Sequence, residues 1–256
     1  MTYINCQLNG EIFEIAFNRP EAYNAFHADM FIELKEACDQ AAESSARIVV
    51  IKGMGKGFSA GGDIGMMMNQ DREEDFHHVM NLIEDITLSL ARMKKVTIAL
   101  VHGAAAGLAF SFALSCDYLF MHQDAKLAMN FNGIGLIPDG GGHFLLAKRV
   151  SEQTAKHLIW SGKKLSAEEA LELRLADGVF HEDIDTYQTT CVKPFLNMPL
   201  QAFVETKMIY FQQSESQLLS FLQKERAAQA RLRKSHDHKE GIQAFLEKRR
   251  PVFEQV

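Results

Sequence analysis

A lone carboxylate lies in the most glycine-rich stretch of the chain. The segment GLIPDGGGHFLL, residues 135–146, places Asp139 after a proline and before three consecutive glycines, and an apolar, helix-like segment follows. An acid at this point can cap the helix expected over 143–150, because its side chain can accept hydrogen bonds from the first free amides. It can instead act as a base at a spot kept open by glycine. The residues alone leave both roles open.

Two other segments join a buried strand, a turn of small residues and a helix. They are VVIKGMGKGFSAGGDI, residues 49–64, and IALVHGAAAGLAFSFAL, residues 98–114. Small residues let a backbone approach a ligand closely, and amides at a helix start point outward with the positive end of the helix dipole behind them. Two such turns facing each other would form an oxyanion hole of backbone donors. Taken alone, each also fits an ordinary strand-to-helix turn.

The elements that must position these turns alternate along the chain. Residues 47–53 form a continuous β-branched run that ends at glycine, which is typical of a strand buried on both faces. Strands alternating with helices predict an α/β core. From about residue 198 the charged, amphipathic segments predict helices only, so we place a boundary near residue 195. The pattern also predicts strands over 12–18, 96–103, 118–123 and 126–131 and helices over 26–44, 76–92 and 108–115.

Length and composition exclude several classes of protein. The 256 residues, 47% of them hydrophobic, suit one large domain or one domain with an appendage. The net charge of -6 argues against a general nucleic-acid binder. No apolar run reaches the length of a membrane span, and the start of the chain does not resemble a signal peptide, so we expect a cytoplasmic protein. Because no cysteine pair has metal-ligand or redox spacing, we expect no metal and buried free thiols at Cys6, Cys38, Cys116 and Cys191.

Five ordered motifs resemble those of the enoyl-CoA hydratase/isomerase (crotonase) family. They are FNRPEAYNAF, GKGFSAGGDI, VHGAAAGLAFSFALSCDYLF, GIGLIPDGGG and EGIQAFLEKRRPVF, and together they extend from about residue 10 to residue 253. The resemblance implies a ClpP-like spiral of strand-strand-helix repeats over residues 1–195, which would bind an acyl-CoA thioester. It further implies that helices over 196–256 pack homotrimers, often paired into hexamers.

The resemblance also assigns binding residues. It implies an oxyanion hole from the amides of Gly62 and Leu108, where loss of one donor typically raises the barrier by about 2.7–4 kcal/mol. The family commonly has glycine at the second position, so Leu108 would narrow the pocket without removing the amide. The adenine of CoA would lie near Ala60, and Phe245 and Lys248 would reach the CoA of a neighbouring subunit. Further substrate contacts are expected from Ile64, Met66, Met67, Gly107, Ser111, Phe131 and His143.

The expected reaction follows from which acids the motifs contain. Hydratases of this family use two glutamates, and the motifs place Ser111 and Phe131 at those positions. Asp139 is then the acid of these motifs that is left for catalysis. Some isomerases of phenylacetate-type breakdown carry their base at this aspartate. One base can move a double bond by taking a proton from one carbon and returning it two carbons away. The glycines after it would leave room for the acyl chain.

We therefore expect an isomerase of lipid or phenylacetate metabolism that needs no cofactor beyond the CoA of its substrate. A hydratase with atypical water activation and a catalytically weak acyl-CoA-binding scaffold remain as alternatives.

Overall fold

Two β-sheets form the centre of the molecule. The computed structural model describes residues 2–69 and 73–254. The larger sheet has the strand order β1-β2-β3-β4-β6-β9, parallel except for the antiparallel β1–β2 pair, and the smaller sheet has the order β5-β7-β8. The strands are β1 (Ile4–Asn9), β2 (Ile12–Phe17), β3 (Ile48–Gly53), β4 (Val96–Val101), β5 (Ala104–Ala106), β6 (Tyr118–His122), β7 (Lys126–Ala128), β8 (Lys164–Ser166) and β9 (Gly178–Phe180).

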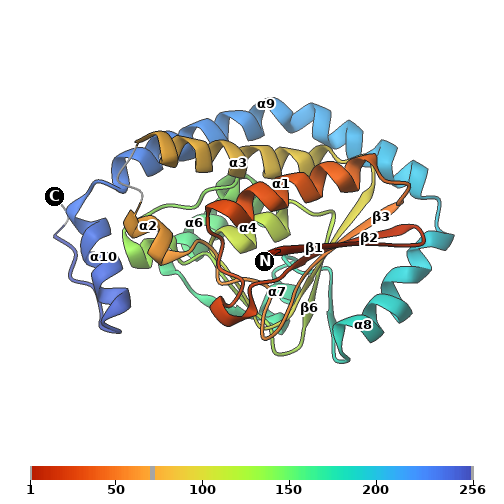
Figure 1. Cartoon of the computed structure of the whole chain (residues 1–256), viewed down its shortest axis with the longest axis horizontal. Coiled ribbons are helices and arrows are strands. Elements are labelled where there is room, and N and C mark those ends of the chain that lie inside the picture. The colour runs from red at the N-terminus through yellow and green to blue at the C-terminus, as the bar shows by residue number, and fades with distance from the viewer. Residues whose placement is uncertain (1, 70–72, 255–256) are drawn as a thin grey trace.

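Helices pack around these sheets. In Figure 1, α3 lies between α1 and the long α9, and α3 packs against both. The α-helices are α1 (Ala28–Glu43), α2 (Ile64–Asn69), α3 (Glu73–Arg92), α4 (Leu108–Leu114), α5 (Gly142–Arg149), α6 (Glu152–Ser161), α7 (Ala167–Glu172), α8 (Ile184–Tyr187), α9 (Leu200–Leu232) and α10 (His236–Leu246). Three 3-10 helices, η1 (Pro20–Ala22), η2 (Phe131–Ile134) and η4 (Lys193–Asn197), and the π-helix η3 (Gln188–Val192) complete the elements of the described residues.

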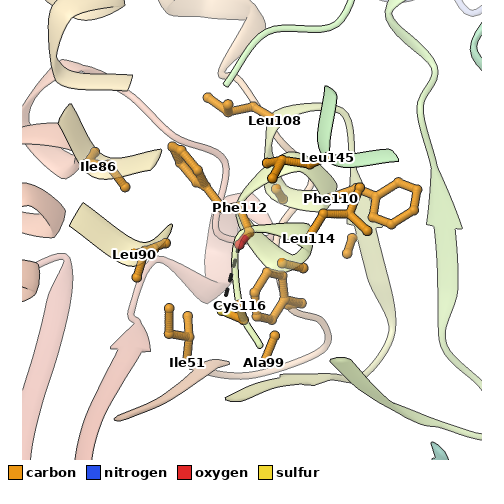
Figure 2. Close-up of a cluster of buried hydrophobic side chains, with 14 of the residues drawn as sticks. Ile51, Ile86, Leu90, Ala99, Leu108, Phe110, Phe112, Leu114, Cys116 and Leu145 are labelled. Atoms are coloured by element: carbon orange, nitrogen blue, oxygen red, sulfur yellow. Dashed lines mark hydrogen bonds between the residues drawn. The ribbon is translucent and has the colours of Figure 1, made fainter. Parts of the chain in front are cut away.

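The central strands are buried as their sequences predict. All of β4 and all but Lys52 of β3 are buried, which a parallel strand covered on both faces requires. Helix α4 is buried over its whole length, and Figure 2 shows its side chains packed among those of β3, β4, α3 and α5. Leu108, the first residue of α4, lies at the edge of this cluster (Figure 2), so the start of the helix borders the core instead of solvent.

The C-terminal region is helical and packs on the rest of the chain. With 33 residues, α9 is about 50 Å long and runs along α3 (Figure 1). It also packs against α5, and α10 packs against η2. The described part of the chain that contains helices and no strands already begins at Ile184, before the composition changes. Within the described residues, no helix is long and apolar enough to cross a membrane.

The cysteines differ in part from expectation. All four are free; Cys38 and Cys116 are buried, as predicted, and burial raises the pKa of the Cys116 thiol to about 12. The prediction was wrong for Cys6 and Cys191, which are exposed. Cys6 lies on β1, where only Ile4 is buried, because β1 is the edge strand of the larger sheet. No group of acidic, histidine and cysteine side chains in residues 2–69 and 73–254 could hold a metal ion.

Candidate functional site

The two strand-to-helix turns lie against each other. A parallel bridge joins Ser59 to Ala105, with the Ser59 amide donating to Ala104 O at 2.9 Å and Ser59 O accepting from Ala106 N at 3.1 Å. Gly61 has φ +89°, and a Cβ there would lie 2.5 Å from Ala106 O. Only glycine therefore permits this approach of the two backbones.

This approach places two free amides at neighbouring turn ends. A Cβ on Gly61 would lie 3.6 Å from the nitrogen of Leu108, so the start of α4 adjoins the turn that contains Gly62. Neither the Gly62 amide nor the Leu108 amide has a backbone acceptor in the part of the chain that the structure describes. Both can therefore donate to a ligand oxygen.

Asp139 lies next to the second of these turns. It precedes Gly140, which has φ +61° and whose Cβ would lie 2.6 Å from Leu108 Cδ1. A left-handed glycine thus lets the segment after Asp139 pack directly on the side chain of Leu108. Asp139 and Leu108 consequently face the same cavity.

This cavity is small and mostly apolar. Its volume is about 70 Å³, and it combines residues from the first turn, α3, α4 and the C-terminal helices. Its lining residues are Phe31, Gly62, Met66, Met67, Phe76, Val79, Met80, Ile83, Leu108, Phe131, Leu136, Asp139, Gln229, Arg233 and His238. Asp139 is the one carboxylate among these described lining residues. Apolar walls with a few polar groups are typical of a small-molecule site, although such sites usually measure about 300–1,000 Å³.

The structure brings together six of the residues singled out in the sequence. Gly62, Met66, Met67, Leu108, Phe131 and Asp139 share the cavity. Gly107 adjoins it, since a Cβ there would lie 3.5 Å from the ring of Phe131. Ala60 and Ile64 lie outside the lining; Ala60 is exposed, and its amide donates to Tyr23 O. Phe245 and Lys248 are exposed at the end of α10, away from the cavity lining of their own chain.

Ser111 is packed behind the glycine turn instead of lining the cavity. Its side chain is fully buried, and a Cβ on Gly142 would lie 2.7 Å from Ser111 Oγ. The glycines at 140–142 therefore accommodate neighbouring side chains, Leu108 at Gly140 and Ser111 at Gly142. The expectation that they leave room for an acyl chain was wrong, because the space that their missing side chains leave is already filled, by α4 at Gly140 and Gly142 and by Leu218 of α9 at Gly141.

Asp139 does not cap helix α5. The N-cap of this helix is Gly141, with φ +76°, and no side chain of its own segment accepts the first amides. Glu225 of α9 takes that role: its Oε2 accepts from Gly141 N at 2.8 Å and its Oε1 from His143 N at 3.1 Å. The capping alternative was therefore wrong, because the amides of Gly141 and His143 donate to Glu225, and the Gly142 amide donates to the main-chain oxygen of Asp139 and not to its carboxylate.

His143 is also engaged with α9. Its Nδ1 lies 2.8 Å from Glu225 Oε1, and its side chain retains 29% of its exposure. His143 does not belong to the cavity lining. The expectation that it contacts substrate is therefore not met in this arrangement, because Glu225 draws the ring toward α9.

The carboxyl group of Asp139 is a weak acid in a dry environment. The residue is 9% exposed, Oδ2 accepts a hydrogen bond of 3.2 Å from Gln229 Nε2, and Oδ1 has no hydrogen-bond partner among the described residues. Burial, and secondarily the nearby carboxylate of Glu225, raise the pKa of Asp139 to about 8. Gln229 opposes this shift by donating to the carboxylate. A pKa near neutrality lets one group both accept and return a proton.

Sequence reasoning missed the contribution of α9 and α10. Glu225, Gln229 and Arg233 follow one another at intervals of four residues, on one face of α9. Gln229 Nε2 also donates to Ile137 O at 2.6 Å, and the Arg233 guanidinium lies 4.5 Å from the centre of the Phe76 ring. A signal was present, because the buried stripe that contains Leu218 and Leu222 continues with the buried polar residues Glu225 and Gln229.

The arrangement combines three chemical abilities. Two backbone amides can stabilise an oxygen that gains negative charge. One carboxyl group with a pKa of about 8 can accept and return a proton. The apolar walls exclude water from a bound hydrocarbon chain.

Comparisons with known proteins identify the family of the chain. Residues 7–256 match the family model described as enoyl-CoA hydratase/isomerase. YhaR of Bacillus subtilis (strain 168), which carries that family's name, is 51% identical over 99% of this chain and 100% of its own length. The 1,2-epoxyphenylacetyl-CoA isomerase of Escherichia coli (strain K12) is 30% identical, covering 99% and 98% of the two chains.

A solved structure extends the comparison to the fold. The crystal structure of an enoyl-CoA hydratase from Mycobacterium avium subsp. paratuberculosis K-10 superposes with a TM-score of 0.89 at 29% identity, covering 98% of each chain. This match confirms the crotonase-type α/β fold with a C-terminal helical region that the sequence predicts.

Proposed function

The chain belongs to the enoyl-CoA hydratase/isomerase family, and we propose that it moves a carbon–carbon double bond within an unsaturated acyl-CoA, with Asp139 as the base. The observation that carries this proposal is the composition of the cavity. Asp139 is its one carboxylate among the described lining residues, and Phe131 and the buried Ser111 occupy the positions where the resemblance leads us to look for the two glutamates of a hydratase.

The geometry supports a two-step proton transfer. The thioester oxygen of a 3-enoyl-CoA would accept hydrogen bonds from the amides of Gly62 and Leu108. Ionised Asp139 would remove a proton from the α-carbon, and the electron pair of that C–H bond would delocalise into a dienolate whose negative charge lies on the oxygen. The same carboxyl group would then return the proton to the γ-carbon, which gives the 2-enoyl-CoA. No water is consumed, so one acid suffices.

The assembly and the rest of the CoA site belong to the same proposal. Exposed apolar side chains gather on the C-terminal helices and the segment after them, including Ile209, Tyr210, Phe245 and Val252. Homotrimers, or hexamers made of two trimers, would bury such side chains. Phe245 and Lys248 are exposed and available to the CoA of a neighbouring subunit, while Ala60 and the backbone around Gly62 would hold the adenine end.

A substrate panel tests the reaction. Purified protein is incubated with 2-enoyl- and 3-enoyl-CoA thioesters of linear and phenylacetate-derived chains, and the products are separated. We expect migration of the double bond without gain of water. Formation of 3-hydroxyacyl-CoA as the main product would establish the hydratase alternative. Binding without turnover across the panel would establish the scaffold alternative.

A further inference from the structure

Glu225 is a buried carboxylate that the proposed reaction does not use. It lies on α9 and is 3% exposed. Its two oxygens accept three hydrogen bonds, from the amides of Gly141 and His143 and from the ring of His143. A charge removed from water in this way is costly unless it is paired and hydrogen-bonded. These three hydrogen bonds indicate that the Glu225 carboxylate is held in a fixed position for a function.

The donors connect Glu225 to the base. Gly141 lies two residues after Asp139, and Gln229, one turn further along α9, donates to both Asp139 Oδ2 and Ile137 O. Helix α9 therefore holds the chain on both sides of Asp139. It also places a second carboxyl group close enough to disfavour ionisation of the first.

We propose that Glu225 is a positioning residue for Asp139, which fixes the glycine turn that carries the base and holds a negative charge beside it, with His143 as one of its hydrogen-bond partners. This inference rests on the proposed function of Asp139. A stronger base removes a proton from carbon more readily, but a smaller fraction of it is ionised at neutral pH. Burial would set most of the pH at which the enzyme becomes active, and Glu225 would raise it further.

The other charged and titratable groups around Asp139 come from three elements. Arg233, at the end of α9, and His238 of α10 line the cavity; burial lowers the pKa of His238 and so keeps its ring neutral at pH 7, which leaves Arg233 as the cation of the two. Arg226 of α9 is engaged by Glu84 of α3 at 2.6 Å. Glu225 is therefore the one negative side chain among the described residues that adds to the effect of burial on Asp139.

The test is the pH dependence of kcat/KM for double-bond migration in the full-length enzyme. Glu225→Gln removes the charge and keeps the shape. We expect the acid limb of the profile to move to lower pH by about one unit, so that at pH 6 the variant is up to about tenfold more active than the wild type. On the alkaline plateau it should be slower. Water that reached Asp139 through a loosened structure would also lower its pKa, so the shift is assigned to the charge of Glu225 only where the melting temperature of the variant matches that of the wild type.

Two further variants separate charge from structure. Glu84→Gln removes another partly buried carboxylate of an ion pair that touches α9, and its profile should match the wild type. His143→Gln can still donate to Glu225 but cannot carry a charge, so its acid limb should stay at, or move above, the wild-type pH. An acid limb that does not move in Glu225→Gln would overturn the inference, as would equal shifts in Glu225→Gln and Glu84→Gln.

If Glu225→Gln does not fold, a direct titration of the Asp139 carboxyl group tests the inference. Infrared spectra of the wild type and of Asp139→Asn identify the protonated carboxyl of Asp139 by difference. Its titration in His143→Gln should lie at or above the wild-type pH, and a shift to lower pH would overturn the inference. If Asp139→Asn retains turnover, the proposed function fails; if it loses turnover while Glu225→Gln keeps the wild-type profile, only the role of Glu225 fails.

Discussion

Replacing Asp139 with asparagine isolates the proton chemistry of the site. Asparagine has the shape of aspartate, and its carbonyl oxygen can still accept the hydrogen bond from Gln229 Nε2. The start of α5 is not disturbed, because Glu225 and the main-chain oxygen of Asp139, and not its carboxylate, accept the first amides. The variant therefore changes the base and leaves the capping of the helix intact.

The expected magnitude follows from the pKa of about 8. At pH 7 about one molecule in ten carries an ionised base, so kcat/KM of the wild type should rise roughly tenfold between pH 7 and pH 9 and then level off. Asp139→Asn should lower turnover by about 10²–10⁴-fold and abolish this pH dependence, because a positioned base contributes a factor of that size. The affinity for CoA should barely change.

Two assays follow the same proton. The absorbance of the conjugated enoyl thioester reports double-bond migration, and NMR in deuterated water reports exchange of the α- and γ-protons. Asp124→Asn, which changes an exposed aspartate in a turn, is the matched control and should behave as the wild type. The reasoning is refuted if Asp139→Asn continues to exchange these protons and turn over substrate, or if its kcat/KM still rises between pH 7 and pH 9.

Three further predictions use the same contacts. Because Asp139 has a raised pKa in the folded chain, the native state keeps a proton that the unfolded state releases between about pH 4 and pH 8. The free energy of unfolding must therefore fall as pH rises through this window, by about 1.4 kcal/mol per pH unit relative to Asp139→Asn. Thermal unfolding of both proteins at several pH values would show this dependence. Leu108→Pro should abolish turnover, because it removes the amide donor. Leu108→Gly should retain turnover per folded molecule but lose about 2–5 kcal/mol of stability, because the Leu108 side chain is buried. Equal loss of turnover in both variants would assign the effect to the side chain. Deleting the last 15 residues should weaken both assembly, measured by light scattering, and CoA binding, measured by calorimetry, and an unchanged affinity for CoA would remove Phe245 and Lys248 from the site.

The helices and strands could be predicted from local sequence patterns, because each one is determined mainly by its own residues. The β-branched run that forms β3 and the apolar spacing that forms α1 are sufficient to choose strand or helix, and both are observed. The small residues of the two turns also indicated a close approach of backbones, which Gly61 makes possible. These features need no knowledge of distant segments.

The environment of Asp139 could not be predicted in the same way. Glu225 and Gln229 lie 84 and 90 residues from the groups that they contact, at Gly141 and Asp139. Periodicity on α9 identifies which face is buried, but not which segment covers that face. The role of the three glycines was missed for the same reason, since Leu108 and Ser111 occupy the space beside them only in the folded chain.

The composition boundary near residue 195 therefore does not separate the proposed base from the C-terminal helices. Residues before this boundary supply the two amides and Asp139. Helix α9 supplies Glu225 and Gln229, the side chains that raise and lower the pKa of Asp139. Glu225 fixes the turn, Gln229 binds the carboxylate and Arg233 closes the cavity. Without α9, water would reach Asp139, its pKa would return toward that of an ordinary aspartate, and the carboxylate would be a much weaker base toward carbon. If neighbouring subunits also pack on α9, the contacts that hold the oligomer and those that surround the proposed base Asp139 share one helix, so a substitution at that interface can change the proposed reaction without contacting Asp139.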